Sequence, residues 1–287
     1  MSKLILGTVQ MGLNYGVNNN KGKITLEESH QILLKANLSG ITSLDTAEAY
    51  GNAHHVIGKF HKNYPYKKFR IVTKVPHDFE ANTIEKKVTE YLKDLEVNSI
   101  ETLMFHSFDS FKNNQKSIDI LLDLKSKGCI DHIGVSVYTN DQIEYLLDKD
   151  FVSVVQLPFN LLDNYSFRGN QIEQLKIKGK IIHTRSAFLQ GLLFKNINDK
   201  NKVVQNLHSE LKILNKIIHN YNCSMEELAL SYCLNQKNID NVIIGVDSLN
   251  HLNTNLLASN YKIDEIIIEK INEIKIKDTD LLNPSLW

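Results

Sequence analysis

Short apolar runs rich in β-branched residues alternate along the chain with longer segments whose apolar residues recur every three or four positions. The short runs are typical of buried strands, and the longer spacing is typical of helices with one apolar face. The predicted strands are 4–8, 41–45, 70–74, 101–106, 132–136, 152–156, 180–185 and 241–245. The predicted helices are 26–39, 52–61, 82–94, 115–127, 140–148, 168–178, 202–220 with 224–235, and 248–257.

Eight consecutive strand and helix units predict an α/β fold, a (β/α)8 TIM barrel of parallel strands. No Pro-rich or Ser-rich linker interrupts the units, so we expect residues 1–287 to form a single domain. The tail adds a C-terminal helix and an extended end, 281–287, and we expect it to cover one mouth of the barrel. The apolar side of that helix consists of Ile263, Ile266, Ile267, Ile271 and Ile274.

Composition limits the possible partners and the compartment. The 33 Lys and Arg residues balance 33 Asp and Glu residues, so the chain has no excess charge with which to bind nucleic acid or an anionic membrane. Three cysteines without a CxxC pair fit a reducing cytoplasm, and no apolar run approaches the roughly 20 residues of a membrane span. A small-molecule partner remains, and the oligomeric state is open.

The predicted strand ends carry the candidate chemistry, because TIM barrels place their sites at the carboxyl ends of the strands. Asp45, Lys74 and His106 end strands two, three and four, which are adjacent in such a barrel. A buried Lys74 would pair with Asp45. Tyr50 lies in the next loop, where the ammonium would lower the pKa of the phenol and make it a general acid. His106 would donate a hydrogen bond to an oxygen that gains charge.

These four residues, in the contexts LDTAEAYG, IVTKV and LMFHS, resemble the catalytic tetrad of the aldo-keto reductases. The segments LGTVQMG, HIGVS, VVQLPFNLLD, RSAFLQGLL and VIIGVDSLNHLNTN follow in family order, so the resemblance covers nearly the whole chain. The sequences of these segments are similar to those of bacterial members associated with surface-sugar pathways. The resemblance implies hydride transfer between NADPH or NADH and a carbonyl, with Tyr50 exchanging the proton and with no metal.

The resemblance also implies a cofactor site. Ser136 and Gln156 would bind the nicotinamide carboxamide. The loop 186–191 would lie along the pyrophosphate and bind it, and residues 245–255 would bind the adenosine. The implied cofactor residues are Thr8, Ser136, Gln156, Arg185, Ser186, Phe188, Gln190, Gly191, Gly245, Asp247, Ser248, His251 and Asn255.

Three positions depart from the family pattern. Arg185, one of only three arginines, replaces the tyrosine that many members stack on the nicotinamide. Val137 replaces an asparagine that often follows the serine. Gly245, Asp247 and His251 stand where other members often place Lys or Arg for a 2′-phosphate, and Asp247 would repel that phosphate. The resemblance implies the family's usual NADPH preference and Asp247 opposes it, so NADPH and NADH both stay open.

The substrate pocket is expected to include Tyr15, His77, Phe108 and Trp287, and the long, Asn-rich first loop, 9–22, would contribute to it. A polar lining favours a hydroxylated or sugar-like carbonyl. For His54 and His55, at a polar helix start, a surface position is a better interpretation than a metal site.

Two other functions remain open at this point. A Schiff-base lyase or aldolase would use Lys74 as its nucleophile, but that lysine would have to be neutral and Asp45 opposes this. A non-catalytic, nicotinamide-binding regulatory module is the other alternative, and the intact tetrad argues against it.

Overall fold

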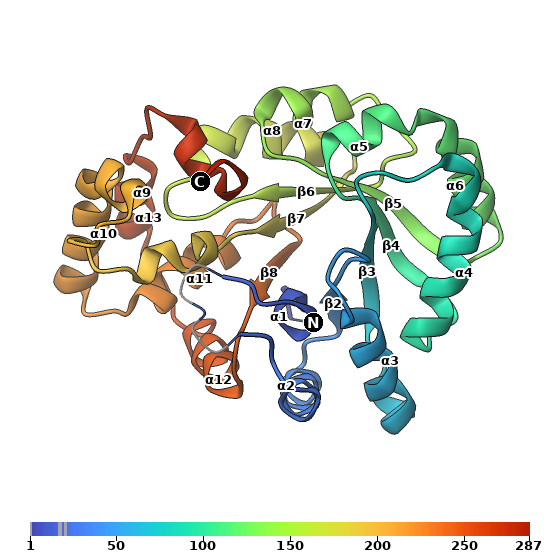
Figure 1. Ribbon diagram of the computed structural model, residues 1–287. Coiled ribbons are helices and arrows are strands. Elements are labelled where there is room, and N and C mark those ends of the chain that lie inside the picture. Colours follow the sequence, from blue (N-terminus) through green and yellow to red (C-terminus); the bar gives the residue numbers. More distant parts are fainter. Residues whose placement is uncertain (1, 17–18, 20–21) are drawn as a thin grey trace.

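In a computed structural model that describes residues 2–16, 19 and 22–287, parallel strands close into a barrel in the order β1 to β8 (Figure 1). The strands are β1 Leu4–Gly7, β2 Ser43–Asp45, β3 Arg70–Val75, β4 Ile100–Phe105, β5 Ile130–Ser136, β6 Val154–Pro158, β7 Ile181–Arg185 and β8 Asn241–Gly245. Each strand pairs with its neighbour in sequence, and β1 pairs with β8. The predicted (β/α)8 barrel is confirmed.

Helices surround the barrel on its outer side (Figure 1). They are α1 Val9–Gly12, α2 Leu26–Leu38, α3 Ala53–Asn63, α4 Ile84–Leu95, α5 Phe108–Asn113, α6 Ile118–Ser126, α7 Asn140–Leu146, α8 Tyr165–Ile177, α9 Lys202–Asn206, α10 His208–Tyr221, α11 Met225–Leu234, α12 Leu249–Ala258 and α13 Glu265–Asn272. Within the described part of the chain, no helix is long and apolar enough to cross a membrane.

Side chains fill the interior of the barrel below the carboxyl ends of the strands. Val72, Met104 and Val154 form a buried cluster separate from the main core. Val72 stands two residues before Lys74 on β3, so both side chains point into the barrel. The main core lies between the strands and the surrounding helices. The interior therefore holds no channel at this level, and the site lies at the mouth above it.

The tail differs from the prediction. Residues 281–287 are not extended but form two 3-10 turns, Thr279–Leu282 and Pro284–Leu286. The side chains of Asp278 and Asn283 accept hydrogen bonds from the backbone two residues later, which favours turns over an extended chain. Ile266 is 59% exposed and does not belong to the buried side of α13.

The helix α13 is fastened to the loop after β6. The Asn164 Nδ2 donates to the carbonyls of Ile271 and Ile274 at 2.8 and 2.9 Å. The Tyr232 hydroxyl of α11 donates to Asn272 and accepts from the backbone of Tyr165. The tail is thus joined to the loop that opens α8.

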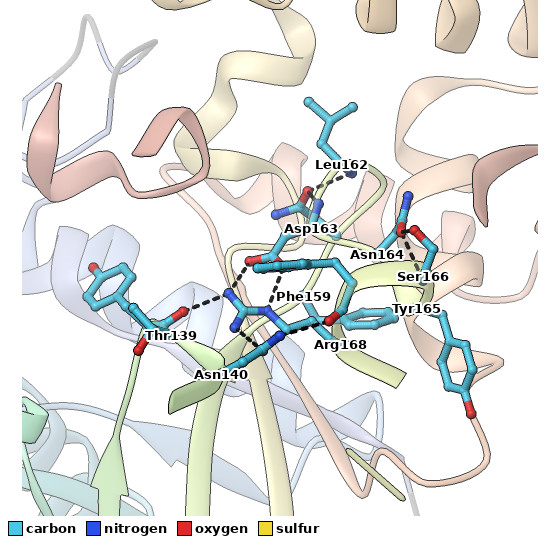
Figure 2. A network of polar contacts seen from close by, with 12 residues as sticks. Thr139, Asn140, Phe159, Leu162, Asp163, Asn164, Tyr165, Ser166 and Arg168 are labelled. Atoms are coloured by element: carbon cyan, nitrogen blue, oxygen red, sulfur yellow. Dashed lines mark hydrogen bonds and ion pairs between the residues drawn. The ribbon is translucent and has the colours of Figure 1, made fainter. Parts of the chain in front are cut away.

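A buried ion pair organises the same loop (Figure 2). Arg168 of α8 binds both carboxylate oxygens of Asp163, Nε at 2.6 Å and Nη2 at 2.9 Å. The side chains of Asp163 and Arg168 are 0% and 3% exposed. The guanidinium also donates to the Asn140 side chain at 2.8 Å and to the Tyr138 carbonyl at 2.7 Å. This pair therefore joins the loops that follow β5 and β6.

We expect Asp163→Asn to lower the free energy of unfolding by about 3–5 kcal/mol, because it leaves the Arg168 guanidinium buried without its counterion. Urea unfolding followed by circular dichroism measures the change. The control is Asp148→Asn, which removes the partner of Lys178 at a carboxylate that is 81% exposed, and its midpoint should stay close to that of the wild type. Equal midpoints for both variants would show that the buried pair contributes little.

Candidate active site

The four residues of the predicted tetrad meet at one side of the barrel mouth. Asp45 is the last residue of β2, Lys74 lies one residue before the end of β3, and His106 directly follows β4. The three strands are neighbours in the barrel, and the loop after β2 carries Tyr50. The predicted convergence of Asp45, Lys74 and His106 is what the structure shows.

Asp45 and Lys74 form a buried ion pair. The Lys74 Nζ lies 2.6 Å from Asp45 Oδ1 and also donates to the Thr46 carbonyl at 3.0 Å. The second carboxylate oxygen, Oδ2, accepts from Gln156 Nε2 at 2.8 Å. Burial by itself would lower the pKa of Lys74, but Asp45 and Tyr50 outweigh it and hold that pKa above its usual value. Lys74 is therefore a cation at neutral pH.

Tyr50 lies beside this cation. Its ring centroid is 5.3 Å from Lys74 Nζ and 5.8 Å from the ring of His106, at an interplanar angle of 80°. Burial raises the pKa of Tyr50, and Lys74 opposes that shift only in part. The expectation that Lys74 brings the pKa below its ordinary value is wrong, because loss of water around the phenol is the larger effect. Tyr50 is held in its protonated, proton-donating form.

His106 is a neutral imidazole. Burial lowers the pKa of His106 to about 3, and the positive charge of Lys74 adds to the effect. Its ring stacks on His77 at 4.5 Å and 18°. Its Nδ1 is buried and has no hydrogen-bond partner among the described residues. A neutral ring can still donate one N–H bond to a ligand oxygen.

Residues far along the chain hold the loop that carries Tyr50. The carboxylate of Glu48 accepts from Lys87 Nζ at 2.8 and 3.0 Å and from the Tyr91 hydroxyl, both on α4. On the other side, a Cβ on Gly12 would lie 1.7 Å from the Tyr50 carbonyl oxygen, so only glycine permits this approach of α1. The sequence analysis missed Glu48 and Gly12, because a charged residue in a loop and a glycine near a helix are too common to indicate a role.

The predicted surface position of His54 is wrong. It is 8% exposed rather than a surface residue, and its Nε2 lies 2.8 Å from the Thr73 hydroxyl. Burial lowers the pKa of His54 to about 4, so the ring is neutral. The polar neighbours His55 and Asn52 hid the apolar surroundings that β3 and α4 supply.

Arg185 ends β7 and faces the loop after β5. Its guanidinium lies 4.0 Å above the Tyr138 ring, and its Nη2 donates to the Val137 carbonyl at 3.0 Å. Arg168 donates to the next carbonyl, that of Tyr138. Two arginines therefore bind successive backbone carbonyls of the turn that follows Ser136. Ser136 and Gln156 lie side by side on paired strands.

The loop after β7 has an unusual backbone. Ser186, Leu189 and Gln190 are non-glycine residues with φ of 64°, 46° and 54°. Strain of this kind gathers at ligand-binding segments. Gln190 Nε2 donates to the Tyr15 hydroxyl at 2.6 Å, which joins this loop to the first loop across the mouth. Phe188 is half-buried and packs against Phe194.

The segment after β8 opens α12. The Asp247 carboxylate lies 2.6 Å from His251 Nδ1, and Ser248 is the N-cap of the helix, its hydroxyl accepting from the His251 amide. Asn255 is 5% exposed, so most of it is withdrawn from any ligand. Thr8 is fully buried and donates to the Asp45 carbonyl at 3.1 Å. Thr8 therefore holds the backbone of Asp45 and is not open to a ligand.

These loops fit a dinucleotide. The loops after strands seven and eight and a helix N-terminus form the usual phosphate site of a TIM barrel. Beside Gly245, the Gln10 side chain lies 3.1 Å from where a Cβ would stand, and Gln10 Oε1 is a buried acceptor without a partner among the described residues. A ligand hydroxyl or amide would satisfy it. Sequence reasoning missed Gln10, since it lies in a loop expected to act as a whole.

The four predicted substrate residues occupy different positions. Tyr15 and His77 are exposed near the tetrad: Tyr50 contributes to the electrostatics of Tyr15, and His77 stacks on His106. Phe108 packs in α5 against Phe111 and Tyr145. Trp287 is 38% exposed and donates to the Leu281 carbonyl. In the first loop, positions 17, 18, 20 and 21 lie outside the described residues.

Comparison with known proteins gives one family. The model of the Aldo/keto reductase family matches residues 3–276. The NADH-specific methylglyoxal reductase of Escherichia coli is 22% identical, with 92% of each chain covered. The L-galactose dehydrogenase of Arabidopsis thaliana is 24% identical, over 83% of this chain and 79% of that protein. The aldo-keto reductase AKR11C1 of Bacillus halodurans, solved in its holo form, has a TM-score of 0.81 at 20% identity, covering 96% of this chain and 93% of that one.

We expect His106 to stay neutral between about pH 5 and 8, because burial holds its pKa near 3, below the unfolded value of about 6.5. Nitrogen-15 NMR of labelled histidine measures this, with the signal assigned by its loss in His106→Gln. In urea the same residue should titrate near pH 6.5. A titration near that pH in the folded protein would contradict the assignment of a neutral ring.

Proposed function

Because the chain belongs to the aldo/keto reductase family and is an NAD(P)-dependent reductase of carbonyl compounds, we propose that Tyr50 is the acid that protonates the carbonyl oxygen of its substrate. The observation that carries this proposal is the buried Lys74, paired with Asp45 at 2.6 Å and lying beside the Tyr50 ring.

Each residue of the tetrad has a separate role in carbonyl reduction. The nicotinamide cofactor would supply the hydride to the carbonyl carbon. The Tyr50 hydroxyl gives its proton to the oxygen, and Lys74 stabilises the phenolate that remains. Asp45 and the Thr46 carbonyl keep Lys74 charged and aimed. His106, as a neutral donor, contributes an N–H bond to the same oxygen.

The contacts of Lys74 also weigh against a lyase. A Schiff base requires a neutral amine, and this ammonium is fixed by a carboxylate and a carbonyl in a buried site. A regulatory role without catalysis would not need this arrangement of four residues. Reduction is therefore the function that the geometry supports best.

We propose a small polar, hydroxylated or sugar-like aldehyde or ketone as the substrate, handled by the chain as one barrel domain in the cytoplasm. The polar residues Tyr15, His77 and Gln190 near the mouth support this class. Among the relatives, one is named for methylglyoxal and one for L-galactose, both small oxygen-rich carbonyl compounds or sugars.

Tyr50→Phe should reduce turnover about 10²–10⁴-fold and leave the dissociation constant for the reduced cofactor within about twofold of the wild type. The phenyl ring keeps the packing and removes only the proton donor. Steady-state rates and cofactor fluorescence measure the two quantities. Tyr66→Phe is the control, since Tyr66 is fully exposed and should not affect either. Near-normal turnover by Tyr50→Phe would refute the assignment of the acid.

We further propose that NADH is preferred to NADPH. Asp247 places a carboxylate in the segment assigned to the adenosine, and it is 20% exposed beside His251. A 2′-phosphate there would meet a like charge. That a relative of similar length is named NADH-specific agrees with this proposal.

Parallel titration of the protein with NADH and NADPH tests the preference. NADH should bind more tightly, and Asp247→Ser should improve NADPH binding by about tenfold while NADH changes little, because only the like charge is removed. If the wild type binds NADPH a hundredfold more tightly than NADH, the assignment of Asp247 is wrong.

A further inference from the structure

Arg185 is a cation without a carboxylate partner among the described residues. Its guanidinium donates to the Val137 carbonyl at 3.0 Å, approaches the Ser186 hydroxyl at 3.5 Å and covers the Tyr138 ring. The carboxylate of Asp163 is within electrostatic reach, but Arg168 already binds both of its oxygens. The charge of Arg185 is therefore not neutralised locally.

The charges within the tetrad cancel. Asp45 and Lys74 form one neutral pair, and both oxygens of Asp45 are occupied, by Lys74 and by Gln156. His106 and His77 add no negative charge. Among the described residues, Arg185 is a positive charge near Tyr50 without a carboxylate partner, and it contributes to the electrostatics of both Tyr50 and His106.

This charge distinguishes the two forms of a nicotinamide cofactor. When a carbonyl is reduced, its carbon receives the hydride and its oxygen receives the proton of Tyr50, which leaves one positive charge on the nicotinamide ring. The reduced ring is neutral. Since the hydride donor must lie next to the carbonyl that Tyr50 protonates, the ring lies within the field of Arg185.

We propose that Arg185 makes the site bind the neutral, reduced nicotinamide ring in preference to the positively charged, oxidised ring. This preference favours carbonyl reduction over alcohol oxidation, because the oxidised cofactor binds more weakly and is released more readily. The inference rests on the proposed function, because it places the ring against Tyr50. Arg168, whose contacts with Asp163 and Asn140 are drawn in Figure 2, also donates to the Tyr138 carbonyl, and this fixes the turn whose Tyr138 ring stacks with Arg185.

The ratio of two dissociation constants isolates the effect. NADH and NAD⁺ carry the same phosphates, riboses and adenine, so any contact of Arg185 with the pyrophosphate changes both constants together. Only the charge of the ring differs. A like charge within about 10 Å in a partly buried site weakens binding by about tenfold or more.

The experiment measures the dissociation constants of NADH and NAD⁺ by calorimetry for the wild type, Arg185→Gln, Arg185→Lys and Arg70→Gln. Arg70 begins β3 at the opposite end of the barrel, and its side chain is 54% exposed, so Arg70→Gln makes the same change in net charge away from the site. The wild type should bind NADH at least about tenfold more tightly than NAD⁺. Arg185→Gln should reduce this ratio about tenfold, while Arg185→Lys and Arg70→Gln should retain it.

An unchanged ratio in Arg185→Gln, or an equal fall in Arg70→Gln, would overturn the inference. So would a parallel loss of both affinities, since that outcome assigns Arg185 to the phosphates alone. Failure of the proposed function looks different: the wild type would bind neither nucleotide, or Tyr50→Phe would turn over normally.

Discussion

The mouth of the barrel depends on the buried ion pair between Asp45 and Lys74. A lysine that is 2% exposed is tolerable only with a counterion and further acceptors, and Asp45 Oδ1 with the Thr46 carbonyl supply them. Because the two residues stand on neighbouring strands, the pairing of β2 with β3 sets their separation. Once this cation is fixed, the phenol of Tyr50 and the imidazole of His106 take their roles from their distance to it.

The surroundings of the site are built to keep its members in place. Glu48, held by Lys87 and Tyr91, anchors the loop that carries Tyr50. Arg168, held by Asp163, anchors the turn on which Arg185 stacks. The Arg168–Asp163 pair is buried and the Glu48–Lys87 pair is partly exposed, and each is a complete ion pair, so the field at the mouth comes from few charges. That is why one arginine without a carboxylate can influence which cofactor form the site accepts.

Much of the fold was readable from the chain. Eight apolar runs separated by helical spacing predicted the barrel, and a polar residue at the end of each run marked the mouth. Consecutive βα units place consecutive strands side by side, so the meeting of Asp45, Lys74 and His106 followed from chain order alone. The short helix α5 and the turns of the tail were missed, because local side-chain capping rather than periodicity forms them. The helix α1 was missed because four residues are too few to show a helical period.

The sequence by itself determined the architecture and the residue types at the strand ends, because periodicity and order along the chain are local properties. The tertiary structure decided how those residues behave. Only there does Gln156 meet Asp45, 111 residues away, and only there does burial outweigh Lys74 and keep Tyr50 protonated. Burial, charge balance and long-range contacts arise from the packing of distant segments, and no local pattern records them.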